Sequence, residues 1–234
     1  MARSSRLSLA SRLALLAGTL LSGGCVSVTQ HPAVYTSAAG DFEMAKRAAL
    51  PATTANGKRG TVTLLSDSAI LTVRHLVDPN QDSLVIAGKT YQIKCASAGS
   101  DGKLQFTGDW SKFEISPPLE EPIVLKKDFD TPIPPGTRIW LCGDWGGSGE
   151  VELVQALVVP RPIWLWWLPK TALTLYDPAG GAPFGGISGG PAFMFDETGQ
   201  PVQIGIYRGT WVWSYNGKRV SSVQAVIRPK KALD

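Results

Sequence analysis

Three polar residues far apart in the chain are of the types that nucleophilic catalysis needs. Ser188 lies in the segment Gly-Gly-Ile-Ser-Gly-Gly-Pro that begins at Gly185. Glycines beside a serine allow close approach of a substrate and can turn backbone N–H groups inward, where an oxyanion would develop. The plainer alternative is a glycine-rich turn without chemistry. Ser188 is therefore a candidate nucleophile that needs a base.

The candidate base is a histidine at the end of an apolar segment. His75 follows Ala-Ile-Leu-Thr-Val-Arg, and the chain contains one other histidine, His31. His31 lies in a segment predicted to be a tether, so His75 is the credible partner for a serine nucleophile. A lone histidine beside a strand is more often structural, and it is the pairing with Ser188 that favours catalysis.

An aspartate opens an alternating segment between these two residues. Asp109 precedes Trp-Ser-Lys-Phe-Glu-Ile, where a solvated turn residue is the usual interpretation. The order His75, Asp109, Ser188 nevertheless differs from the orders of the α/β-hydrolase and subtilisin triads and agrees with the chymotrypsin order. The order therefore favours a Ser-His-Asp triad.

These segments resemble the three signature motifs of trypsin-like serine proteases, and their short spacing resembles the bacterial Deg-type branch. Ile-Leu-Thr-Val-Arg-His, ending at His75, resembles the histidine motif. The segment from Asp109 is similar to the aspartate motif, and Gly-Ile-Ser-Gly-Gly-Pro around Ser188 to the serine motif. The resemblance covers residues 60–229. It implies an all-β fold of two six-stranded antiparallel barrels, with the active site in the cleft between them.

The resemblance also implies a role for each site residue. His75, Asp109 and Ser188 would be catalytic, and the N–H groups of Gly186 and Ser188 would form the oxyanion hole. Ala182 matches the floor of the substrate pocket, and Ile206 lies on the strand that lines it. A small uncharged residue at the floor predicts a preference for apolar substrate side chains. No cofactor or metal is expected.

One departure from the family concerns the residue before the serine. Ile187 replaces the aspartate that pairs with a freed N-terminus in digestive members. That activation route is absent, so other contacts must hold the oxyanion loop. The replacement also keeps open a catalytically silent pseudoprotease that acts as a lipid-anchored binding module. Esterase or other acyl-transfer activity by the same triad is a third possibility.

The first residues have the order of an export signal. Arg3, Arg6 and Arg12 precede a short apolar segment, and Ser22-Gly-Gly-Cys25 follows it. This order is typical of a secreted protein, and the segment is too short for a stable membrane span. Cys25 resembles the lipidated cysteine of bacterial lipoproteins, although Ser22 stands where Leu is usual. An ordinary cleaved signal is the alternative.

The expected organisation has four parts: a lipoprotein signal at 1–24, a tether at 25–58, an N-terminal barrel at 59–130 and a C-terminal barrel at 131–234. A short helix is expected over 41–49. Many short apolar or alternating segments, with 25 Gly and 17 Pro, favour an all-β fold. The Pro-rich segment 131–136 is interpreted as the linker between the barrels.

Charge and cysteine content narrow the set of partners. Without the signal the chain has 20 basic and 19 acidic residues, which gives no reason to expect nucleic acid. The expected partners are a polypeptide substrate and a bacterial membrane, reached through Cys25 on the periplasmic or cell-envelope side. The apolar segment Trp164–Trp167 is predicted to be a buried strand or packed loop, with contact to the membrane as the alternative. Cys95 and Cys142 are expected to be separate thiols, with a disulfide as the alternative.

Overall fold

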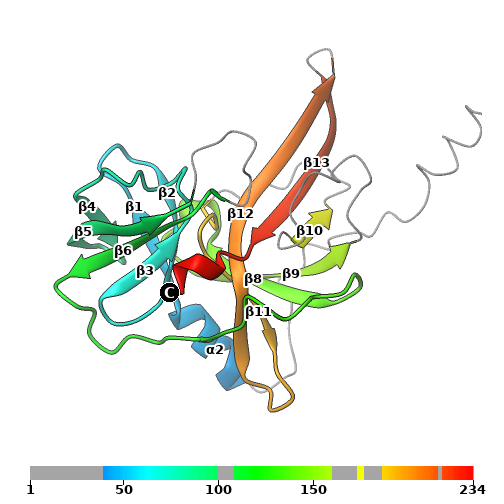
Figure 1. Ribbon diagram of the computed structural model, residues 1–234, viewed down its shortest axis with the longest axis horizontal. Helices are drawn as coiled ribbons and strands as arrows, with labels where there is room; N and C mark the ends of the chain where they lie inside the picture. The colour runs from blue at the N-terminus through cyan, green and yellow to red at the C-terminus, as the bar shows by residue number, and fades with distance from the viewer. Residues whose placement is uncertain (1–38, 100–107, 160–172, 177–185, 216–217, 234) are drawn as a thin grey trace, which may run out of the picture.

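The computed structural model describes residues 39–99, 108–159, 173–176, 186–215 and 218–233. Its two β units lie side by side, with a closed barrel on the left of Figure 1 and a larger sheet on the right. No helix among the described residues is long and apolar enough to cross a membrane. The fold is mostly β, as the sequence predicts.

Six antiparallel strands close the first barrel in the order β1-β2-β3-β6-β5-β4. Alternating burial along β5 and β6 sends one set of side chains inward, including Tyr91, Ile93, Phe113 and Ile115. The strands are β1 (Ala49–Thr53), β2 (Arg59–Leu64), β3 (Ala69–Thr72), β4 (Ser83–Ile86), β5 (Lys89–Ala98) and β6 (Ser111–Ser116).

The first barrel begins inside the segment predicted to be a tether. Strand β1 pairs with β2 and, at its other edge, with β4, so it closes the barrel. Helix α2 (Ala39–Arg47) precedes it and starts two residues before the helix expected over 41–49. A tether reaching residue 58 is therefore wrong. The Ala- and Thr-rich composition of this segment does not predict a strand. Strand β1 is stabilised by its pairing with β2 and β4, not by local β propensity.

The second unit is a seven-stranded sheet in the order β11-β8-β9-β10-β13-β12-β7, with an additional pairing of β11 to β12. One closed barrel is thus seen where two were expected. β7 adds to the edge of β12 in parallel. The strands are β7 (Lys126–Lys127), β8 (Arg138–Asp144), β9 (Val151–Val159), β10 (Leu173–Tyr176), β11 (Pro191–Phe195), β12 (Pro201–Tyr215) and β13 (Lys218–Ile227), with 3₁₀ turns η2 (Trp145–Gly147) and η4 (Lys230–Ala232).

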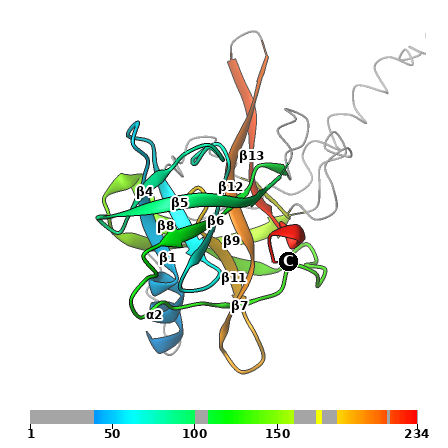
Figure 2. The same cartoon turned by 60° about the vertical axis from the view of Figure 1, so that its left-hand side comes forward.

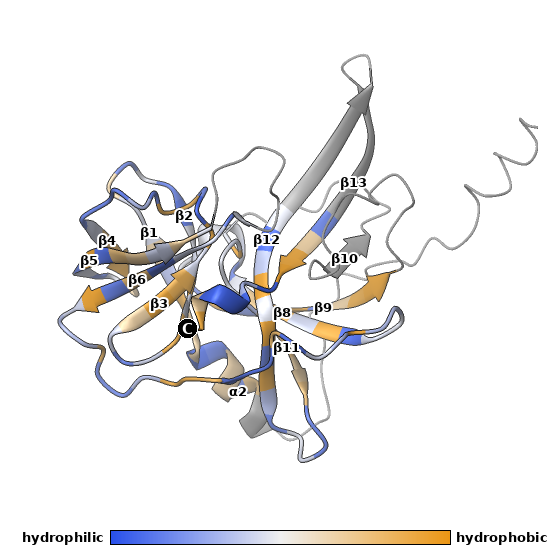
Figure 3. Ribbon diagram, in the orientation of Figure 1, coloured by the Kyte–Doolittle hydropathy of each residue, from blue (hydrophilic) through white to orange (hydrophobic). Residues whose placement is uncertain are grey.

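The hydrophobic core continues from the barrel into the sheet. Ile206, Ala225 and Ile227, from β12 and β13, are buried in the same cluster as the barrel residues. In Figure 3 parts of the β3 and β9 ribbons are orange, which marks hydrophobic residues, whereas the terminal turn η4 is blue. This shared core fixes β12 against the barrel.

Helix α2 packs against the second sheet although the next strand belongs to the barrel. Phe42 makes edge-to-face contacts with Trp140 and Phe195, at centroid distances of 5.2 and 4.9 Å. The Cys142 thiol donates to the carbonyl oxygen of Ala45. Figure 2 shows the helix below β1 and β8. Residues 39–53 therefore connect both units.

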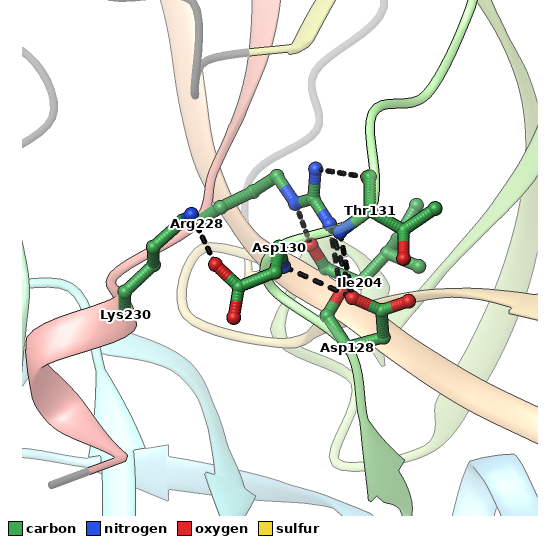
Figure 4. A network of polar contacts seen from close by, with 6 residues as sticks. All are labelled: Asp128, Asp130, Thr131, Ile204, Arg228 and Lys230. Carbon is green, nitrogen blue, oxygen red and sulfur yellow. Dashed lines mark hydrogen bonds and ion pairs between the residues drawn. The ribbon is translucent and has the colours of Figure 1, made fainter.

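The segment between the two units is bound by one buried arginine at the end of β13 (Figure 4). Arg228 donates to the carbonyl oxygens of Ile204, Asp128 and Thr131 at 2.7–2.8 Å. Lys230 forms an ion pair with Asp130 beside it. The predicted linker is thus fastened to β12 at its first residues.

Both described cysteines are free thiols, as favoured from the sequence. Burial raises the pKa of Cys142 far above its ordinary value, and burial also raises the pKa of Cys95. Each therefore stays protonated at neutral pH.

Candidate active site

Strand register brings the predicted histidine and aspartate together. β3 and β6 are antiparallel, with Thr72 opposite Ser111, so the residues after Thr72 lie beside those before Ser111. His75 follows β3 on a tight turn closed by N–H groups of Leu76 and Val77 on the carbonyl oxygen of Val73. The barrel thus places the imidazole beside Asp109.

His75 and Asp109 make two contacts. The His75 Nδ1 atom lies 2.7 Å from Asp109 Oδ2, and the His75 backbone N–H donates to Oδ1 at 2.9 Å. The imidazole is 46% exposed, whereas the carboxylate is 13% exposed. With Nδ1 facing Asp109, the other ring nitrogen, Nε2, is the one left for a reacting group.

The electrostatics of Asp109 favour its ionised form. Burial alone would raise the pKa of this carboxyl group, but hydrogen bonds from His75 and the charges of His75 and Arg208 lower it below its ordinary value. Arg208 forms an ion pair with the carboxylate, with Nε 2.8 Å from Oδ2. Asp109 is thus an anion at neutral pH that can stabilise an imidazolium.

Ser188 lies in a turn between the sheet and the barrel. Its carbonyl oxygen accepts from the Thr61 N–H at 2.9 Å, and the next residues bond with Tyr207 on β12. Its Oγ lies 3.6 Å from the point where a Cβ on Gly209 would stand. Gly209 directly follows Arg208, the residue paired with Asp109, so Ser188 faces the same part of β12 as the histidine–aspartate pair.

A second relation ties Ser188 to the turn that holds His75. A Cβ on Gly60 would meet a Leu76 methyl carbon at 2.4 Å and the Ser188 carbonyl oxygen at 3.0 Å. The residue after His75 and the main chain of Ser188 therefore both border Gly60. Within the described residues, His75 and Ser188 are not hydrogen-bonded to each other.

Thr61 holds the turn before the serine and was missed from the sequence. Its buried hydroxyl donates to the carbonyl oxygen of Gly186 at 2.8 Å and accepts from the Asp144 N–H at 3.0 Å. A threonine in a strand carries no pattern that marks this role, because the partners are distant in sequence. Ile187 is 1% exposed and its side chain is apolar, so that side chain offers the loop no hydrogen bond. The Thr61 hydroxyl supplies one to Gly186 instead.

Gly186 adopts a backbone conformation that only glycine allows without strain. Its φ is +95°, and a Cβ there would stand 1.8 Å from the Asp144 carbonyl oxygen. Among the described residues, neither the Gly186 nor the Ser188 N–H has a hydrogen-bond acceptor. Both donors are thus free of partners there, as an oxyanion site requires.

The remaining predicted site residues fall into two groups. Ile206 is completely buried in the core cluster, and its predicted place along the substrate pocket stays a prediction. Ala182, Cys25 and the Trp164–Trp167 segment lie outside the described residues. Arg208, like Thr61, was not recognised from the sequence. A cation next to glycine on an expected strand gives no local sign of an aspartate partner.

Solved structures of serine proteases have a similar fold. The inactive form of the Rv3671c protease matches with a TM-score of 0.55 at 16% identity, over 82% of this chain and 89% of that one. An inactive serine-to-alanine mutant of Rv3671c from M. tuberculosis H37Rv gives 0.57 at 15% identity, over 88% and 92%.

A third similar structure is the serine endoprotease from Yersinia pestis, with a TM-score of 0.57 at 17% identity, over 86% of this chain and 65% of that one. No family model and no curated protein sequence matches the chain. The chain therefore shares its fold with these serine proteases.

Proposed function

We propose that the chain is a trypsin-like serine endopeptidase with His75, Asp109 and Ser188 as its triad. The observation that carries this proposal is the doubly bonded His75–Asp109 pair. Further support is that Leu76, the residue after His75, and the Ser188 carbonyl oxygen both border Gly60. The likeness of fold to serine proteases supports it. The same geometry also serves esterase or other acyl-transfer chemistry.

The reaction begins with attack of Ser188 on the scissile carbonyl carbon. The His75 Nε2 atom takes the hydroxyl proton as the bond from Oγ to carbon forms, and Asp109 stabilises the resulting imidazolium. The N–H groups of Gly186 and Ser188 donate to the oxyanion. Collapse breaks the amide C–N bond, and His75 gives the proton to the leaving amine.

Hydrolysis of the acyl-enzyme completes the cycle. A water molecule takes the place of the amine, and the His75 Nε2 atom accepts its proton as the new C–O bond forms. The proton then returns to Ser188 Oγ as the ester bond breaks and the acid product leaves. No cofactor takes part in these steps. Catalysis requires a hydrogen bond between His75 Nε2 and Ser188 Oγ, a contact that in enzymes often tightens only when substrate binds.

A catalytically silent pseudoprotease that acts as a lipid-anchored binding module is the second candidate. The specific observation in its favour is that the imidazole and the serine hydroxyl are not hydrogen-bonded. The retained histidine–aspartate pair argues against it, because a binding surface has no need of an aligned imidazole.

Labelling with a fluorophosphonate probe tests the choice. The purified full-length chain should be labelled, and Ser188→Ala should not. His75→Ala should reduce the labelling rate at least 100-fold, because the hydroxyl loses its base. Lack of labelling of the folded parent would favour the binding module. If the parent is labelled, an assay of peptide cleavage separates a protease from an esterase. A protease should cleave peptides, and the same variants should lose that cleavage.

The proposed location is the periplasmic or cell-envelope side of a bacterial membrane. Residues 1–24 would act as the export signal and Cys25 would carry the lipid. The support is the order of basic, apolar and small residues in the sequence. The Trp164–Trp167 segment is a second candidate membrane contact, because tryptophan favours membrane interfaces.

A further inference from the structure

The carboxylate of Asp109 is shared by groups from both units of the fold. On the barrel side, His75 contacts it through its backbone N–H and its ring. From β12, Arg208 reaches the oxygen, Oδ2, that the ring contacts. The carboxylate therefore has a permanent cation beside it in addition to the imidazole.

The guanidinium of Arg208 lies close enough to both Asp109 and the His75 ring to influence their charges. Nδ1 of His75 lies 2.7 Å from Oδ2 and Nε of Arg208 lies 2.8 Å from it, so the two nitrogens cannot be further apart than the sum of these distances. The Asp109 and Arg208 side chains are 13% and 25% exposed. Charges at this range in a partly buried site are only weakly screened by salt.

We propose that Arg208 is a positioning residue that extends the activity of the site to lower pH. The guanidinium opposes a second positive charge on the neighbouring imidazole and neutralises part of the carboxylate charge that would favour it. Both effects keep His75 available as a base in more acidic solution. This inference rests on the proposed serine-hydrolase function.

Other charged groups stand near His75 in the fold or in the sequence. Lys58 Nζ donates to the His75 carbonyl oxygen, and Arg74 donates to that of Gly99. Asp78 follows on the segment after His75. Among the described residues, Arg208 and His75 alone are within ion-pair distance of Asp109. The lowered pKa of Asp109 agrees with this arrangement.

The rate of fluorophosphonate labelling, measured from pH 4 to 9, tests the inference. In Arg208→Gln, the midpoint of the acidic limb of the rate–pH curve should rise by about 0.5–1 pH unit. This is the size expected when the repulsion between a guanidinium and an imidazolium about 5 Å apart in a partly aqueous site is removed. Arg208→Lys should shift the midpoint by less than half as much. Arg59→Gln is the matched control, since Arg59 donates to the Gly147 carbonyl oxygen, and it should not shift the midpoint.

An NMR titration gives a reading that needs no activity. In the background Ser188→Ala, with His31→Gln removing the other histidine, the His75 ring resonances should titrate at higher pH in Arg208→Gln than in the parent. A parent that is never labelled would overturn the proposed function. A titration midpoint unchanged in Arg208→Gln would overturn the role of Arg208 by itself.

Two further variants separate charge from packing. Arg208→Met and Arg208→Ala remove the same charge and leave different side-chain volumes. A shift common to the folded variants reports the charge. Loss of folding in every variant without the charge, with Arg208→Lys folded, would make Arg208 a structural residue and overturn the proposal.

Discussion

The backbone N–H of Thr61 donates to the carbonyl oxygen of Ser188 across the boundary between the barrel and the sheet. The Thr61 hydroxyl, on the barrel side, donates to the Gly186 carbonyl oxygen and accepts from the Asp144 N–H, both on the sheet side. One strand residue thus fixes the proposed nucleophile and the loop of the proposed oxyanion donors to the unit that holds His75.

Thr61→Val should reduce kcat roughly 10–100-fold with a smaller change in KM, because the loop that carries the oxyanion donors would lose its position. The unpaired groups of Gly186 and Asp144 should also lower the free energy of unfolding by about 1–3 kcal/mol. Thr61→Ser keeps the hydroxyl and should restore most of the rate. Steady-state kinetics and urea unfolding measure both effects, and a fully active Thr61→Val would contradict the role.

Gly186→Ala should abolish labelling of Ser188 and destabilise the fold. The added methyl group would stand 1.8 Å from the Asp144 carbonyl oxygen, at a φ of +95°. Gly57→Ala is the matched control, because its φ is +79° and no atom lies within 4 Å of the added carbon. Comparable loss of labelling in both variants would point to backbone strain instead of the oxyanion loop.

Arg228→Met should lower the free energy of unfolding by roughly 2–4 kcal/mol, because three carbonyl oxygens would lose a charged donor inside the protein. Lys230→Met removes a nearby cation from a surface ion pair and should cost less than about 1 kcal/mol. Chemical denaturation of both variants measures the difference. Equal losses in the free energy of unfolding would show that the buried Arg228 stabilises the fold no more than the exposed Lys230 does.

Acid should destabilise the protein partly through Asp109. Because the pKa of this group is lowered in the folded state, its contribution is present above the pKa of the unfolded chain and is lost as pH falls through the folded-state value. Melting temperatures should therefore fall below about pH 4. Asp109→Asn should show a flatter decline over that range, and parallel curves for the two proteins would contradict this assignment.

Cys25→Ser should release the chain from membranes into the soluble fraction, because the proposed lipid attachment would be lost. Metabolic labelling with a fatty-acid analogue should mark the parent alone. Cys95→Ser is the matched control, because it makes the same substitution at a free thiol outside the export signal. A Cys25→Ser variant that stays membrane-bound would favour the Trp164–Trp167 segment as the contact.

The sequence could predict which segments meet but not what holds them together. The contact of His75 with Asp109 was predictable from their order in the chain and from the resemblance of their segments to protease motifs, and the pairing of β3 with β6 brings it about. Thr61 and Arg208 act through partners more than 80 residues away in the chain or on the other unit. Strand β1 escaped prediction because its pairing with β2 and β4, not its composition, makes it a strand.

The packing of α2 has a mechanical consequence. The helix lies on the sheet through Phe42, and the chain then enters the barrel at β1. A pulling force applied before residue 39 would first peel the helix from Trp140 and only afterwards reach β1. The aromatic contacts of Phe42 would thus yield under load before the barrel that carries His75 is opened.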